Sequence, residues 1–250
     1  MQHTSICLPT SKMKKLLSAL LVVLASCTYH DLHVNPCFLS SEQNLSGSVT
    51  YFYNNQNQLV SYAASNVYSS VLTYDESGKI VSEVDNQVLS ITYSYDNKNR
   101  LTLWSQSVQN YSGYNSQTKF FYNSLDQDTL QQFYKYNVSG AYYLWRYARR
   151  EFVNHKNYSK VQTFDGATNS LLYSEEYQWD SHPNPYLTNA FFLNSPPPTN
   201  NMTRHTFTIP GSVPQSFDYT YIYNNKGFPI EKRDPSTNVF ISSYTYTNCH

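Results

Sequence analysis

The sequence predicts an all-β domain: an extended antiparallel meander of repeated hairpins that forms a curved open sheet or a partly closed barrel. Three observations predict it. Tyrosine is unusually frequent, with 25 residues in 250, while charged residues make up only 14% of the chain. Aromatic and polar residues alternate at a period of two, which is typical of strands. A turn motif also recurs at a fixed interval of 21 residues, which indicates a repeat architecture.

The chain begins with the features of a secretory signal peptide. Its apolar run is too short to cross a bilayer, which takes about 20 residues. Because residues 1–12 stand oddly upstream of Met13, we expect translation to begin at Met13. The alternative is that the apolar run is a buried helix. The signal-peptide features are, in order, two lysines, an apolar run and two small residues before a cysteine: Lys14, Lys15, 16–24, Ala25, Ser26 and Cys27.

The segment Leu24-Ala25-Ser26-Cys27 resembles the lipobox of bacterial lipoproteins. The resemblance implies that Cys27 is diacylated and becomes the first residue of the mature protein. Residues 1–26 would then be the signal peptide, residues 27–47 a tether, and the membrane a partner through the lipid anchor. No acidic residue follows the cysteine, and by resemblance to enterobacterial sorting this implies the outer membrane. The sequence leaves open whether the domain faces the periplasm or the cell surface.

Two cysteines, Cys37 and Cys249, lie near the two ends of the mature chain. In an oxidising envelope compartment they are able to pair. Such a bridge would close nearly the whole domain, and the chain-entropy model credits it with roughly 4–5 kcal/mol. The sequence leaves open the alternative of two unpaired thiols in two tails.

A turn motif recurs along the chain. Segments 53–59, 74–80 and 95–101 superimpose without gaps, and segment 223–229 keeps the first half of the pattern. In each segment, Asn or Asp follows the tyrosine and is able to bond its own downstream backbone, and Gly or Asn three positions later supplies a positive φ. Each copy therefore predicts a hairpin turn. The residues assigned to this structural role are Tyr53, Tyr74, Asp75, Gly78, Tyr95, Asp96, Tyr223 and Gly227.

Strands are expected on both sides of each turn. Alternating residues precede the turns, as in 49–53 and 91–95, and a second run follows each turn, as in 80–84. One repeat is therefore one hairpin. Successive hairpins should pair side by side, with their tyrosines forming a column on one face of the sheet.

Tyr74-Asp75-Glu76-Ser77-Gly78-Lys79-Ile80 resembles the YD repeats of RHS-type proteins. The chain as a whole resembles the uncharacterised YD-like (RHS-like) lipoproteins common in Bacteroidetes. The resemblance covers most of 48–248 and implies a single β-repeat domain. RHS proteins build a very large β shell around a toxin, and a chain of 250 residues is too short for that, so encapsulation is not implied.

Residues 181–216 interrupt the hairpin pattern. They hold seven of the 11 prolines, including Pro196-Pro197-Pro198, whose polyproline II preference is that of a stiff connector. We expect one long crossing loop that returns the chain for the last strands. These strands are expected at 202–208, 217–223, 228–233 and 239–246.

The sequence predicts no cofactor and no metal site. The histidines lack ligand spacing, and the 126–128 segment lacks the further oxygen ligands of a calcium loop. Zero net charge gives no electrostatic case for nucleic acid. Asp165 and Asp180 could act as the paired carboxylates of a carbohydrate-active enzyme. Because Asp recurs at the repeat turns, turn capping is the favoured role for both.

Aromatic richness is the feature with a binding mechanism, because Tyr and Trp rings stack on sugars or anchor protein partners. We therefore predict a non-enzymatic envelope lipoprotein whose aromatic sheet surface binds a glycan or an envelope protein. The alternatives are the enzyme just described and a purely structural docking protein. For any single aromatic, packing within the sheet is the competing interpretation. The candidate binding residues are Trp104, Tyr142, Tyr143, Trp145, Tyr147 and Trp179.

Overall fold

The computed structural model describes residues 37–65, 68–86, 88–137, 139–154, 156–187 and 198–249. Every described residue belongs to one compact unit, Val34–His250. The predicted signal peptide, Cys27 and the first part of the tether therefore lie outside the described residues. Within the described part, no helix combines the length and the hydropathy that a membrane crossing requires.

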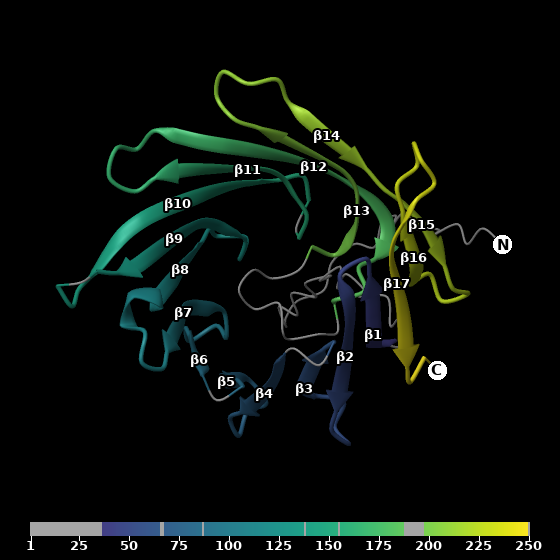
Figure 1. The fold of residues 1–250 in the computed structure, drawn as a ribbon, viewed down its shortest axis with the longest axis horizontal. Coiled ribbons are helices and arrows are strands. Elements are labelled where there is room, and N and C mark those ends of the chain that lie inside the picture. The colour runs from purple at the N-terminus through teal and green to yellow at the C-terminus, as the bar shows by residue number, and fades with distance from the viewer. Residues whose placement is uncertain are drawn as a thin grey trace, which may run out of the picture. The chain divides into compact units, whose positions relative to one another are not determined.

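The predicted all-β class is confirmed. The described residues form 17 antiparallel strands in one meander sheet and a single 3-10 turn, η1 (Ser112–Tyr114). Within this unit the strands curve into a nearly closed barrel with one unsealed seam (Figure 1). The strands are β1 Phe38–Asn44, β2 Gly47–Tyr53, β3 Leu59–Ala64, β4 Tyr68–Tyr74, β5 Ile80–Asp85, β6 Leu89–Tyr95, β7 Leu101–Val108, β8 Ser116–Tyr122, β9 Asp128–Tyr136, β10 Tyr142–Phe152, β11 Tyr158–Asp165, β12 Leu171–Pro183, β13 Asn200–Thr208, β14 Gln215–Asp218, β15 Thr220–Tyr223, β16 Pro229–Arg233 and β17 Phe240–Thr247.

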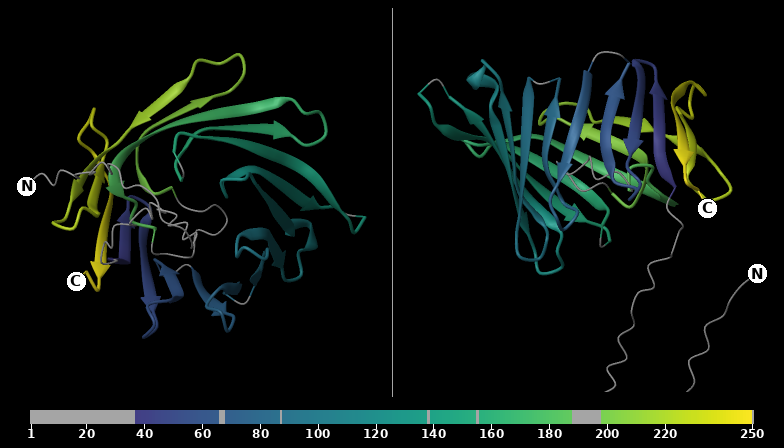
Figure 2. Two further views of the ribbon diagram at one scale, coloured as in Figure 1. Left: turned by 180° about the vertical axis from the view of Figure 1, so that it is seen from behind. Right: turned by 90° about the horizontal axis from the view of Figure 1, so that it is seen from below.

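The barrel closes because the first and last strands pair. β1 pairs with β2 on one side and with β17 on the other, so strands from opposite ends of the sequence lie side by side (Figure 2). The unsealed seam lies at Tyr219. There β14 pairs with β13 and β15 pairs with β16, and no ladder joins β14 to β15 among the described residues. The Tyr219 N–H instead donates to the Thr203 carbonyl at 2.8 Å.

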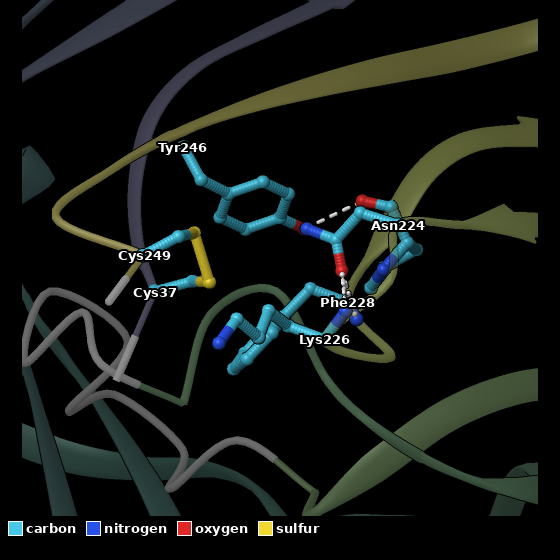
Figure 3. The surroundings of a disulfide bond; sticks show 7 residues. Cys37, Asn224, Lys226, Phe228, Tyr246 and Cys249 are labelled. Atoms are coloured by element: carbon cyan, nitrogen blue, oxygen red, sulfur yellow. Dashed lines mark hydrogen bonds between the residues drawn. A yellow bond between two sulfur atoms is a disulfide. The ribbon is translucent and has the colours of Figure 1, made fainter. Parts of the chain in front are cut away.

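Cys37 and Cys249 form a disulfide at this closure, with an S–S distance of 2.04 Å. The bond continues the β1–β17 ladder, in which Phe38 pairs with Thr247. Figure 3 shows the disulfide beside the turn that begins at Asn224, whose side chain accepts from the Phe228 N–H at 3.0 Å. The disulfide therefore joins the two ends of the sheet covalently.

Six hairpin turns in the described residues share one hydrogen-bond pattern. In the turn at Asp75, Oδ1 accepts from the N–H groups of Ser77 and Lys79, both at 2.9 Å. Gly78 has φ +81°, which favours glycine, and its N–H donates to the Asp75 carbonyl at 3.0 Å. The pattern recurs at Asn54, Asp96, Asn123, Asn137 and Asn224, with positive φ at Asn57, Asn99, Asp126, Gly140 and Gly227.

The aspartate turns should make stability sensitive to acid. Hydrogen bonds from the backbone of Lys79 and Arg100 hold the pKa values of Asp75 and Asp96 below their usual range. Since the unfolded pKa is about 3.9, this stabilisation is complete above that pH and is lost as the pH falls through the folded values. We expect the double variant Asp75→Asn/Asp96→Asn to keep both turns, as Asn54 and Asn123 do, and to show a flatter dependence of Tm on pH below 4. A slope equal to that of the wild type would contradict this.

The tyrosine that precedes a turn also links neighbouring hairpins. The Tyr74 hydroxyl donates to the Leu59 carbonyl at 2.7 Å, and the Tyr95 hydroxyl donates to the Ile80 carbonyl at 2.8 Å. Burial raises the pKa of both tyrosines to about 12, so the hydroxyls remain donors at neutral pH. The same link is made by Tyr53 to Leu39, Tyr122 to Leu101 and Tyr246 to Pro229.

Replacing one of these tyrosines by Phe should cost about 1 kcal/mol, because the ring stays packed while a half-buried carbonyl loses its donor. We expect Tyr74→Phe and Tyr95→Phe to lower the free energy of unfolding measured in urea. Tyr111→Phe is the matched control, since the Tyr111 side chain is 61% exposed. Equal stability of Tyr74→Phe and Tyr111→Phe would contradict the role of these links.

Side chains along the strands divide into a buried set and an exposed set. On β2, Tyr51 is buried and Phe52 is 48% exposed, and across β4 and β5 the paired Val71 and Val84 are both exposed. Side chains on the concave face of a curved sheet converge, so we assign the buried set to the inside of the barrel. The predicted column of tyrosines lies on this inner face.

The predicted crossing loop at 181–216 is not one loop. β12 extends to Pro183, β13 occupies Asn200–Thr208, and β14 begins at Gln215. Polar side chains hold the chain on both sides of residues 188–197: Asn184 Nδ2 donates to the Asn200 carbonyl at 3.3 Å, and Asn157 Oδ1 accepts from the Thr199 N–H at 2.8 Å. These side-chain bonds satisfy the backbone carbonyl of Asn200 and the backbone N–H of Thr199.

Candidate functional site

The inner face of the barrel differs between its two halves. A continuous core of Leu, Ile and Tyr side chains fills the inner face of β1–β8 and β17. The inner face of β11–β14 instead carries aromatic rings that stay partly exposed. The core residues are Leu39, Tyr51, Leu59, Tyr62, Leu72, Ile80, Ile91, Tyr93, Leu101, Phe120 and Tyr244.

Five rings of β11–β14 form a continuous series, which we call the aromatic ladder: Tyr158, Trp179, Tyr177, His205 and Phe217. Register places them on one face, because Tyr177 pairs with His205 and His205 pairs with Phe217. The Tyr177 and His205 rings stack with centroids 5.0 Å apart, and the His205 and Phe217 rings lie 6.1 Å apart. The Trp179 ring lies 5.7 Å from Tyr177 and stacks on it.

Hydrogen bonds and burial orient the ladder. Trp179 Nε1 donates to the Tyr158 carbonyl at 2.7 Å, which fixes the indole. The Tyr158 ring meets the Trp179 ring edge to face at 5.3 Å. Phe217 is 47% exposed, so the last ring presents open apolar area. The rings are thus held in place from one end and exposed at the other.

Charged groups lie beside the rings. His205 Nε2 and Glu175 Oε1 are 3.1 Å apart, and their side chains are 21% and 23% exposed. Arg150 lies 5.3 Å from the centroid of Tyr158 and pairs with Asp128 at 2.7 Å. Burial and the Glu175 carboxylate raise the pKa of Tyr177, so its hydroxyl stays protonated at neutral pH.

This arrangement can bind a ring-shaped, hydroxyl-rich molecule. Because the rings stack on one another, the open stacking face is that of the last ring, Phe217, and the other rings offer their exposed edges. The Glu175 carboxylate accepts hydrogen bonds from hydroxyl groups, and the imidazole of His205 offers a second polar contact. Within the described residues, no group of three or more His, Cys, Asp or Glu side chains could hold a metal ion.

The structure does not bring the six predicted binding aromatics together. Trp179 belongs to the ladder, whereas Trp104 pairs with Tyr93 and packs against the core. The other four lie on β10. Tyr142 and Tyr143 are exposed near its start, Trp145 lies under Lys135 at 3.5 Å, and Tyr147 stacks on Phe164 at 4.9 Å on the outer face.

Asp165 and Asp180 belong to separate hydrogen-bond networks. Asp165 Oδ1 accepts from the Thr168 N–H at 2.8 Å within its own turn. Asp180 reaches across the seam instead: its carboxylate accepts from Asn201 Nδ2 at 3.1 Å and from the Tyr223 hydroxyl. Asp180 therefore ties β12 to β13 and β15, a role that the predicted turn capping does not describe.

The sequence interpretation missed five residues of this site: Tyr158, Glu175, Tyr177, His205 and Phe217. One signal was present: Tyr173, Glu175, Tyr177 and Trp179 alternate along a single strand and so share one face. His205 and Phe217 join them only through the register of β12, β13 and β14, which no local pattern specifies.

No protein-family model matches this chain, and no curated protein matches it. Solved structures do match. A porin-like protein from Bacteroides uniformis is 15% identical with a TM-score of 0.54, and one from Bacteroides vulgatus is 10% identical with a TM-score of 0.56. Each alignment covers 85% of this chain and 99% of the other. At these identities the similarity establishes the fold, a barrel like those of porin-like proteins.

Proposed function

We propose that this chain is a non-enzymatic lipoprotein of the cell envelope, anchored in the outer membrane through Cys27, whose barrel binds a glycan on the aromatic ladder. The observation that carries the proposal is the series of partly exposed rings from Tyr158 to Phe217 beside the Glu175–His205 pair. The similarity to porin-like proteins supports an envelope location. The six equivalent turns support kinship with YD-like lipoproteins.

A glycan suits this site better than a protein partner does. The ladder lies on the inner, concave face, where an extended protein surface would clash with the barrel wall. An oligosaccharide presents the flat faces and hydroxyl groups that rings and carboxylates recognise. The two aspartates of the alternative enzyme, Asp165 and Asp180, are each engaged in a separate network, which supports binding without catalysis.

The porin-like neighbours favour a second candidate, a channel through the barrel. A membrane-embedded barrel needs an outward-facing apolar band about 25 Å tall. The outer face of β2–β7 carries mainly hydroxyl side chains, with few apolar residues such as Phe52 and the Val71–Val84 pair, so this part of the outer face favours contact with water. The outward hydroxyl residues are Ser48, Thr50, Ser61, Ser69, Thr73, Ser82, Ser90, Thr92, Ser94, Ser105 and Ser107.

Glycan binding should depend on Phe217. We expect a glycan array to identify ligands. In calorimetric titration, Phe217→Ala should lower the affinity for these ligands by up to about tenfold, because one stacking face is lost. Phe52→Ala is the matched control, because Phe52 is 48% exposed, as Phe217 is 47% exposed, but lies on the outer face. A blank array, or equal losses in the two variants, would contradict the proposed function.

The anchor has a separate test. The wild-type protein should incorporate a radioactive fatty acid when cells are labelled with it. It should also fractionate with outer membranes. The Cys27→Ser variant should remain unlabelled and should stay in solution without detergent. A variant that stays in the membrane without label would instead support the embedded channel.

A further inference from the structure

Lys232 lies on β16 next to the open end of the aromatic ladder. Its Nζ lies 3.7 Å from the centroid of the Tyr219 ring. Tyr219 follows Phe217 by two residues, so their Cα atoms lie about 7 Å apart along an extended chain. Lys232 therefore extends the ladder by one charged position.

The register places Lys232 on the inner face. It pairs with Tyr221 on β15 and with Ser242 on β17, and Ser242 is buried. The neighbouring inner residue of β17, Tyr244, belongs to the core. The ammonium group is thus held among tyrosine rings and hydroxyl groups.

Lys232 makes no ion pair among the described residues. The carboxylate that acts on it, at longer range than an ion pair, is Glu42, whose Oε2 accepts from the Tyr186 hydroxyl at 2.6 Å. Burial lowers the pKa of the Lys232 ammonium, and Glu42 only partly opposes this. Removing an ammonium from water without a close carboxylate is costly, and a cation–π contact offsets part of that cost. An anionic ligand at this position would supply the missing charge.

We infer that the ligand of the aromatic ladder is an acidic oligosaccharide, and that Lys232 binds the carboxylate of one of its sugars. This inference rests on the proposed function. One compact cation matches one carboxylate, whereas phosphate recognition commonly uses the fork of an arginine or several donors. A neutral sugar ring of the same chain would stack on the open face of Phe217.

The probes that test the inference are a tetramer of galacturonic acid and the same tetramer with every carboxylate methyl-esterified. We expect the wild-type protein to bind the acidic tetramer at least about tenfold more tightly in calorimetric titration, since a charge-assisted contact is gained. Lys232→Met should abolish this preference and retain the affinity for the ester. Lys232→Arg should keep the preference.

Lys119→Met is the matched control, because Lys119 also lies over a tyrosine ring, at 4.8 Å from the Tyr134 centroid, but on the outer face. It should leave the preference unchanged, and thermal unfolding should show that each variant is folded. Equal affinity of the wild type for both tetramers, or a preference that survives in Lys232→Met, would overturn the inference and leave the proposed function standing. Binding of neither tetramer, together with a blank glycan array, would overturn both.

Discussion

Removing the Cys37–Cys249 disulfide should lower the free energy of unfolding by about 4–5 kcal/mol, the largest effect we expect of any change in this chain. The two cysteines are 212 residues apart in sequence, so the bond restricts nearly the whole unfolded domain. It also holds β1 against β17, the pairing that closes the barrel. Urea unfolding of the wild type and of Cys37→Ser/Cys249→Ser measures the loss.

A reducing agent supplies the control for this result. It should destabilise the wild type by about the same amount and leave the double serine variant unchanged. If the variant unfolds at the same urea concentration as the oxidised wild type, the bond contributes nothing and the closure of the barrel depends on its ladder alone.

Breaking the Arg150–Asp128 pair should cost about 3–5 kcal/mol. The two side chains are 10% and 3% exposed and approach to 2.7 Å, and Gln131 Nε2 also donates to Asp128 Oδ2 at 2.5 Å. Arg150→Met leaves a buried carboxylate without its guanidinium. Burial already raises the pKa of Asp128 above its usual range, and loss of Arg150 should raise it further.

The loss of unfolding free energy in Arg150→Met should therefore become smaller as the pH is lowered, because a protonated Asp128 carries no charge for a cation to neutralise. The double variant Arg150→Met/Asp128→Leu should recover most of the stability, since two apolar groups of similar size replace the pair. Urea unfolding of the four proteins completes the double-mutant cycle. Additive losses in the double variant would contradict a coupled buried pair.

The turns could be predicted from the sequence because their chemistry is local. Asp75 bonds the backbone two and four residues ahead, and Gly78 provides the positive φ that closes the turn. All the atoms involved lie within five residues, so the 21-residue period indicated the hairpins and their order directly. The tyrosine links follow from the same period, because each joins one repeat to the repeat before it.

The candidate site could not be predicted in the same way, because it depends on register between distant strands. The β10 aromatics look like one cluster in sequence, but the register shift between Leu144 and Arg146 distributes them over different environments. Tyr147 stacks on the outer face, whereas Trp145 lies under Lys135. The closure of the sheet likewise depends on β1 meeting β17, a pairing that no hairpin turn specifies.

The most direct test of the central claim uses the three tryptophans as reporters. Trp104 packs against the core, Trp145 lies near the start of β10, and Trp179 belongs to the aromatic ladder. Labelling with 5-fluorotryptophan gives each one a fluorine resonance, assigned by single Trp→Phe substitutions. When a glycan that binds the protein is added in a titration, we predict that the Trp179 resonance shifts while those of Trp104 and Trp145 do not. A shift at Trp145 with none at Trp179 would place the binding site on β10 and contradict the ladder.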